Sequence, residues 1–212
     1  MLVRNFCRAL PGLLLALAVS ACGTADNPYA KFQDPPLVRA KLHTVTLASD
    51  TGAIAEQVRQ GGFTAVTLPP NYPQADSVEA QIWGVPEPVA TKALHFSAAT
   101  PDRPNVRVLV LPLAAQGRTA ANEINEAFFR NVLGTDVPRW PLASAQPEDV
   151  RIQAWTYLVP DILAASKRLR GNGIPVIYDP VGITTAYLGD HRTLAIRSPD
   201  GTVVQLVETA AQ

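Results

Sequence analysis

The side chains of this chain that could take part in chemistry are few and lie far apart in the sequence. Three histidines, His43, His95 and His191, offer imidazole nitrogens, while Gln205 and Glu208 offer oxygens near the C-terminus. Imidazole and carboxylate groups are ligands that divalent cations take in proteins. The sequence contains no G-x-S-x-G, P-loop, H-E-x-x-H or dinucleotide-binding motif. A metal site is therefore the enzymatic possibility that these residues raise.

The elements that would position Gln205 are readable in residues 152–208. The run IQAWTYLV predicts a strand, and Pro160-Asp161 begins a helix with apolar residues at helical spacing in ILAASKRLR. Gly171-Asn172-Gly173 ends this helix, because glycine and asparagine adopt positive φ at little cost. IPVIYD and TLAIRS predict strands, and Pro199-Asp200-Gly201 predicts the turn before the strand TVVQLVE. The predicted order is strand, helix and three strands.

The same order occurs earlier in the chain, from residue 41. LHTVTLAS predicts a strand, Asp50 or Thr51 caps the helix GAIAEQVRQ, and FTAVTL resumes as a strand after Gly61-Gly62. When Asp50 is set against Asp161, the two segments align without a gap, and Gly62 falls on Gly173. Any strand and helix align with another such pair to some extent. The cap, helix length and glycine stop agree together, which favours an internal duplication.

This order of elements, with SPDGTVVQLVE at its end, resembles the repeating β-α-β-β-β module of the vicinal oxygen chelate superfamily. That superfamily includes glyoxalase I, extradiol dioxygenases and bleomycin-resistance proteins. The resemblance implies an α+β fold in which two β-α-β-β-β modules form one curved mixed sheet, a glyoxalase-like open barrel. We expect the first module over residues 41–113 and the second over residues 151–209. Residues 114–150 would form a helical insert, ended by Gly134, and a proline-rich linker; the helix would pack on the sheet or lie over the cleft.

The resemblance also implies where a metal would bind. In metal-dependent members the first and fourth strands of each module supply the ligands, and one ligand is a histidine seven residues before the helix-capping aspartate. His43 has that spacing to Asp50, while Ala154 holds the same place in the second module. Gln205 replaces the glutamate expected after Pro-Asp-Gly, and Arg107 is the matching residue of the first module.

These positions make a poor metal site, so the resemblance leads us to expect no metal cofactor. Arg107 is permanently cationic, and Ala154 has no lone pair to offer. If a divalent metal were bound at all, its candidate ligands would be His43, Gln205 and Glu208, although strand alternation places Glu208 on the opposite face from Gln205. Without a metal, Arg107 and Gln205 favour a carboxylate or another oxygen-rich ligand, because guanidinium binds carboxylates bidentately.

Other side chains of the second module could line the same pocket. Tyr178, Tyr187 and Arg192 lie on or beside its strands, and each of them could equally well be a packing or surface residue. We expect His95 to be a half-buried strand residue and His191 to be exposed at a turn.

Residues 1–21 resemble a bacterial lipoprotein signal peptide. Arg4 and Arg8 precede the apolar run LPGLLLALAV, which is too short to span a bilayer, and Val-Ser-Ala-Cys ends at Cys22. The resemblance implies that Cys22 is acylated and becomes the mature N-terminus, with residues 22–40 as a tether. Gly23 then implies sorting to the outer membrane, facing the periplasm. The alternatives are an ordinary secretory signal or an uncleaved anchor.

Composition excludes some functional classes. Cys7 would leave with the signal peptide and Cys22 would be lipidated, so no thiol would remain for a disulfide or a nucleophile. The 18 basic residues balance 18 acidic residues and form no basic run, which argues against nucleic-acid binding.

Three functions from different classes agree with these features. The first is an envelope protein that binds a small oxygen-rich or anionic ligand in the cleft with a degenerate metal site. The second is a metal-dependent lyase, isomerase or dioxygenase, and the third is a cell-envelope interaction module without a small ligand. The isolated His43 favours the binding protein over the enzyme. The expected partners are the membrane, through the lipid anchor, and a small molecule, with the chain a monomer or homodimer.

Overall fold

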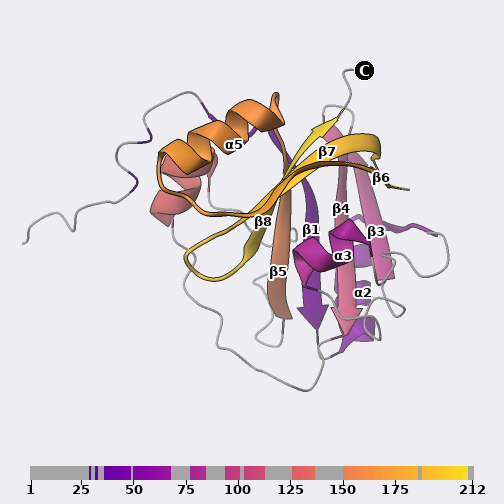
Figure 1. Cartoon of the computed structure of the whole chain (residues 1–212). Helices are drawn as coiled ribbons and strands as arrows, with labels where there is room; N and C mark the ends of the chain where they lie inside the picture. Colours follow the sequence, from indigo (N-terminus) through magenta and orange to yellow (C-terminus); the bar gives the residue numbers. More distant parts are fainter. Residues whose placement is uncertain are drawn as a thin grey trace, which may run out of the picture.

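One mixed sheet of eight strands organises the chain (Figure 1). This computed structural model describes residues 29, 32, 36–48, 50–67, 77–84, 94–100, 103–112, 126–136, 150–185 and 188–209. The strands are β1 (Ala40–Ala48), β2 (Thr64–Ala65), β3 (Leu94–Thr100), β4 (Arg103–Pro112), β5 (Val150–Leu158), β6 (Val176–Thr185), β7 (Gly189–Arg197) and β8 (Val203–Thr209). Their order across the sheet is β2-β3-β4-β1-β5-β8-β7-β6.

The sheet consists of two halves with the same topology. In each half the first and last strands are parallel neighbours, β1 with β4 and β5 with β8, and the remaining pairs are antiparallel. The halves join through the antiparallel pair β1 and β5. A helix follows the first strand of each half, α2 (Thr51–Gln60) after β1 and α5 (Ile162–Gly171) after β5. The predicted α+β fold, with two β-α-β-β-β modules in one open mixed sheet, is confirmed.

The two module helices begin and end by the same local chemistry. The Asp50 carboxylate accepts a hydrogen bond from the Ala53 amide at 2.9 Å, and the Asp161 carboxylate accepts from the Leu163 and Ala164 amides, each at 2.9 Å. These bonds satisfy amides that the first turn of a helix leaves without partners. Both helices are ten residues long, and both are followed by a glycine at positive φ, Gly62 or Gly173.

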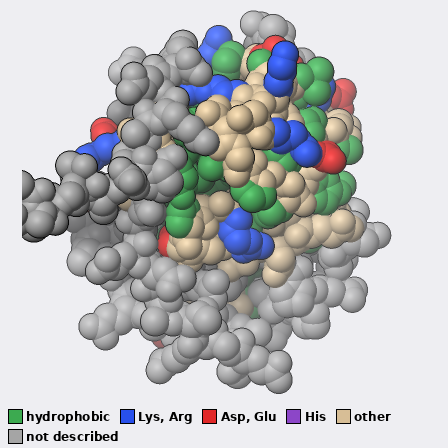
Figure 2. All heavy atoms as spheres, turned by 60° about the vertical axis from the view of Figure 1, so that its left-hand side comes forward, with side chains coloured by type: hydrophobic (Ala, Val, Ile, Leu, Met, Phe, Trp, Pro, Cys, Tyr) green, Lys and Arg blue, Asp and Glu red, His purple; other side chains and the backbone are tan. Residues whose placement is uncertain are grey.

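The main hydrophobic core lies on one side of the sheet, which we call the helix-covered face. Three helices contribute to it: α2, α5 and the short π-helix η1 (Phe128–Leu133). The helix predicted before Gly134 is thus present in the described part of the insert, and it packs on this face rather than over a cleft. Figure 2 turns the α5 side forward and shows several Lys and Arg side chains there, with exposed apolar groups between them; Leu163 of α5 is 55% exposed.

A second, smaller cluster occupies the opposite side of the sheet, which we call the α3 face. The helix α3 (Val78–Trp83) comes between β2 and β3 in the chain and is drawn in front of the sheet in Figure 1. The Ser77 hydroxyl caps it by accepting from the Ala80 amide at 3.1 Å, and Gly84 ends it at a φ of 63°. The corresponding connection of the second module, between β6 and β7, is only three residues long, so α3 makes the two modules unequal.

The folded domain begins before residue 40. Phe32, Leu37 and Val38 are buried in the main core, and the Leu37 and Val38 amides donate to the Leu133 carbonyl at 3.0 and 3.1 Å. The predicted tether of residues 22–40 therefore includes residues that pack with the domain. Residues 1–21 and Cys22 lie outside the described residues, and so does the proline-rich linker after residue 136. Among the described residues, no helix combines the length and the apolar character that a membrane span requires.

Candidate functional site

The pairing of the parallel strands fixes which residues of the two modules are equivalent. Gln205 on β8 lies beside Thr156 on β5. The counterpart of Thr156 in the first module is Val45, since each lies five residues before its capping aspartate. Val45 lies beside Leu109 on β4, so Leu109 rather than Arg107 holds the place of Gln205. The prediction placed this equivalence two residues too early, and Arg107 is instead the β4 neighbour of His43.

Gln205 is the most completely bonded polar side chain at the predicted metal position. Its amide oxygen accepts from the Trp83 indole nitrogen at 3.0 Å and from the Thr156 hydroxyl at 2.9 Å. Its amide nitrogen donates to the Thr193 hydroxyl at 3.0 Å, and that hydroxyl donates to the Leu206 carbonyl at 3.2 Å. Only 1% of Gln205 is exposed. Because an amide oxygen has two lone pairs, both are occupied here.

The helix α3 covers this position with apolar side chains. Trp83 and Ile82 pack against a cluster on the α3 face that also includes Val45, Leu109, Leu111, Ala154, Ala195 and Val203. The Gln153 side chain donates to the Trp83 carbonyl at 2.7 Å and ties the end of the helix to β5. A ligand that reached Gln205 would first have to displace the α3 helix.

The chemistry of this donor set does not suit a divalent metal. Gln205 has committed its oxygen to two donors, while Ala154 and Leu109 have no donor atom. His43 lies on β1 at the predicted place, but its side chain is outside the described set, as is that of Arg107. In the described part of the chain, no three His, Cys, Asp or Glu side chains come together as a metal-binding group.

Glu208 lies on the opposite face of the sheet from Gln205, as strand alternation predicted. One oxygen of its carboxylate accepts from the Ile162 amide at 2.6 Å. This amide belongs to the first turn of α5, where backbone amides lack partners within the helix and the helix dipole favours a negative charge. Glu208 therefore helps to fix α5 on β8. Its distance of 3.9 Å from the Arg192 guanidinium marks an ion pair that is longer than a hydrogen bond.

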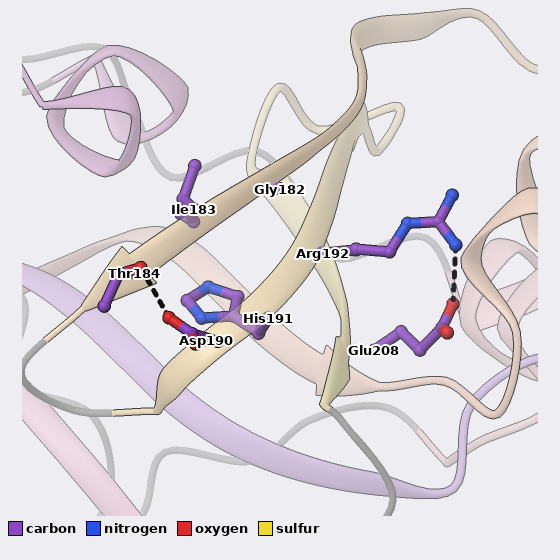
Figure 3. Close-up of a pocket in the computed structure, with 7 residues that line it drawn as sticks. All are labelled: Gly182, Ile183, Thr184, Asp190, His191, Arg192 and Glu208. Carbon is purple, nitrogen blue, oxygen red and sulfur yellow. Dashed lines mark hydrogen bonds and ion pairs between the residues drawn. The ribbon is translucent and has the colours of Figure 1, made fainter.

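A pocket of about 500 Å³ opens beside Arg192 and Glu208, near the ends of β6 and β8 and the start of β7 (Figure 3). Its lining comes from three adjacent strands: Gly182, Ile183 and Thr184 of β6, Asp190, His191 and Arg192 of β7, and Glu208 of β8. Arg192 was predicted to line the pocket around Gln205, and it lines this separate pocket instead. Tyr178 packs against the cluster on the α3 face instead, and Tyr187 lies outside the described residues.

His191 is buried, not exposed at a turn as the sequence suggested. It is 5% exposed because β7 begins at Gly189 and places His191 inside the sheet. One ring nitrogen, Nδ1, lies 2.9 Å from the Gly189 carbonyl oxygen. Burial lowers the pKa of His191, against smaller opposing effects of the Gly189 carbonyl and the Asp190 charge, and so favours the neutral ring. His95 is buried as well, rather than half-buried.

No strong sequence signal identifies the residues that surround Gln205. Trp83 lies in a stretch, NYPQADSVEAQIWGVPEP, that reads as a long loop or a short helix, and nothing in it predicts contact with β8. Thr156 and Thr193 are ordinary strand residues until the strand register brings them beside Gln205. No sequence feature distinguishes Gly182 from other glycines; only the structure shows the open space above it.

Neither a protein-family model nor a curated protein matches this chain. Among solved structures, it is similar to methylmalonyl-CoA epimerase from Mycobacterium tuberculosis, with 18% identity and a TM-score of 0.44 over 85% of this chain and 96% of that one. A glyoxalase/bleomycin resistance protein/dioxygenase superfamily member from Vibrio splendidus has 10% identity and a TM-score of 0.39, over 80% and 97%.

Proposed function

We propose that this chain is a lipid-anchored protein of the cell envelope whose glyoxalase-like domain, related to the vicinal oxygen chelate superfamily, binds a small oxygen-rich molecule without metal chemistry. The lipid anchor rests on the signal-like residues 1–21 and on Cys22. The binding function rests on a sheet that has the two-module topology but whose metal position is filled by packed apolar side chains.

The observation that carries the proposal is the environment of Gln205. A metal ligand needs a lone pair directed at the ion, and both lone pairs of the Gln205 oxygen accept hydrogen bonds from Trp83 and Thr156. Recruiting Gln205 to a metal would break at least one of these two buried hydrogen bonds and leave its donor without a partner. Each buried donor left without a partner costs about 1–3 kcal/mol. This cost opposes metal binding, and His43 is the one strong ligand among the four residues at the metal position, His43, Leu109, Ala154 and Gln205.

We therefore predict that the full chain, purified without chelator, contains no stoichiometric Zn, Ni, Mn or Fe. Its melting temperature should be the same with and without EDTA, because no folded-state ligand is removed. Elemental analysis by mass spectrometry and a thermal melt measure these two quantities. Near-equimolar metal that is absent from His43→Ala would contradict the proposal and would make the metal-dependent enzyme the leading function.

The anchor makes a separate prediction. Cells grown with an alkyne-tagged fatty acid should label the wild-type chain, and Cys22→Ser should remove the label because the thiol that carries the acyl chain is absent. The Cys7→Ser variant is the matched control and should keep the label, since Cys7 lies within the signal-like segment. Equal labelling of wild type and Cys22→Ser would show that Cys22 is not the lipidated residue.

A further inference from the structure

The Thr184, Asp190, Arg192 and Glu208 side chains of the pocket lie on the helix-covered face, away from the metal position. Arg192 pairs with Gly182 on one side and with Glu208 on the other, and Asp190 pairs with Thr184. Directly paired residues of adjacent strands direct their side chains to the same face of a sheet. Leu206, two residues before Glu208, belongs to the core under α5, so this row of paired residues shares the face of α5.

Gly182 creates the opening. Apart from Gly182 and its two chain neighbours, no described heavy atom lies within 4 Å of the position that a Cβ atom would take there, and the φ of Gly182 is not in the left-handed range. The backbone therefore does not require glycine at this point. A glycine inside a strand leaves space where a side chain would otherwise stand, and such a site allows close approach of a ligand. The pocket volume of about 500 Å³ is within the range of small-molecule sites.

The pocket presents donors and acceptors side by side. The Arg192 guanidinium and the Glu208 carboxylate lie 3.9 Å apart, too far for a hydrogen bond, and their side chains are 41% and 27% exposed. The Thr184 hydroxyl donates to the Asp190 carboxylate at 2.6 Å, which holds that acid at the rim. Figure 3 shows Arg192 directed toward Glu208, and Thr184 and Asp190 paired at the other end of the pocket.

The charges of the lining disfavour an anionic ligand. The lining contains two carboxylates, Asp190 and Glu208, and one guanidinium, Arg192. An anion would gain one favourable contact and face two repulsive ones. A simple cation would gain two favourable contacts and face one repulsive one, but both carboxylates already have partners, the Arg192 guanidinium for Glu208 and the Thr184 hydroxyl for Asp190. A hydroxyl group both donates and accepts, so it can accept from the guanidinium and donate to the carboxylate 3.9 Å away.

We infer that this pocket binds a neutral polyhydroxylated molecule of the carbohydrate class. The inference rests on the proposed binding function and specifies its ligand and its site. Vicinal hydroxyls of one sugar ring would bridge Arg192 and Glu208 and reach Asp190, while the space above Gly182 accommodates the ring. The site is separate from Gln205, which lies on the other face of the sheet.

The inference can be tested on the full chain in a detergent without a sugar head group. With ¹⁵N-glycine labelling, the 13 glycines give a small spectrum, and the Gly182 signal is identified by its loss in Gly182→Ile. Glucose, N-acetylglucosamine and trehalose are titrated separately, with inorganic phosphate and the zwitterion alanine as comparison ligands. We expect at least one sugar to shift the Gly182 and Gly189 signals saturably, and phosphate and alanine to shift them less.

Three variants assign the binding to the pocket. Gly182→Ile fills the open space and Arg192→Met removes the guanidinium but keeps the stem, so each should weaken sugar binding at least tenfold, read from the Gly189 signal for Gly182→Ile. Gly171→Ile adds the same side chain at the end of α5, where space is also open, and should bind like the wild type. Unchanged melting temperatures confirm that the variants are folded.

Three results would overturn the inference: no shift with any of the three sugars, stronger binding of phosphate or alanine, or unchanged sugar binding by Gly182→Ile. Each of these leaves the metal content unaffected, so a metal-free chain would still support a binding protein with its ligand elsewhere. Stoichiometric metal lost in His43→Ala would instead refute the proposed function, whatever the sugars do at Gly182.

Discussion

Replacing Trp83 with alanine should lower the free energy of unfolding by about 3–5 kcal/mol, the usual cost of truncating a buried tryptophan. Trp83 is 1% exposed and fills the centre of the cluster on the α3 face. Its removal leaves a cavity against Gln205 and deletes one of the two hydrogen bonds to the amide oxygen. Chemical denaturation monitored by far-UV circular dichroism measures the change.

A pair of milder variants separates the hydrogen bond from the packing. Trp83→Phe keeps an aromatic ring but lacks the indole N–H, and Gln205→Met keeps the length of the side chain but lacks the amide. In a double-mutant cycle these two changes should couple by about 1 kcal/mol, the net value of one buried hydrogen bond. Additive effects of the two variants would show that Trp83 and Gln205 are not bonded in solution.

Replacing Gly134 with alanine should destabilise the chain by about 2–5 kcal/mol, because two costs add at one residue. Gly134 has a φ of 72°, a region that L-residues enter at a cost. A Cβ atom there would also lie 2.5 Å from the Pro36 Cα and 2.8 Å from the Pro36 Cβ. The segment before β1 would have to move away from η1, which would weaken the bonds from Leu37 and Val38 to the Leu133 carbonyl.

Gly62→Ala is the matched control for this prediction. Gly62 also has a positive φ, 89°, but no described atom lies within 4 Å of the Cβ position. Its substitution should therefore cost only the backbone strain, about 1–2 kcal/mol. The difference between the two variants measures the contact with Pro36. Equal losses of stability at Gly134 and Gly62 would mean that residues 36–38 are not docked on η1.

The sequence predicted those parts of the fold that depend on local chemistry. Asp50 and Asp161 cap the two module helices as expected, and Gly173 follows the second helix at positive φ, because an aspartate oxygen and a glycine backbone act within a few residues of each other. The Pro199-Asp200-Gly201 turn is present too, with the Ser198 amide bonded to the Thr202 carbonyl at 2.9 Å.

The parts that escaped prediction depend on contacts between distant segments. The sequence comparison predicted Arg107 as the first-module equivalent of Gln205, whereas strand pairing places Leu109 there. The error arose because no local signal determines the register of β4 against β1. The contact of Trp83 with Gln205 spans 122 residues, and no periodicity signals it. His191 was expected in a turn because Gly189-Asp190 is typical of turns, yet this glycine opens the strand β7.

The early start of the folded domain would limit how far the domain could move from a membrane to which Cys22 was anchored. If Cys22 anchors the chain in a bilayer as proposed, the anchor lies only ten residues before Phe32, which is already buried in the main core. Ten residues span at most about 35 Å when fully extended. The domain would then stay within a short distance of the bilayer and sample only a thin layer of the periplasm along it. Molecules would have to diffuse into that layer to be captured, and chains anchored in the same leaflet would share it at high local concentration.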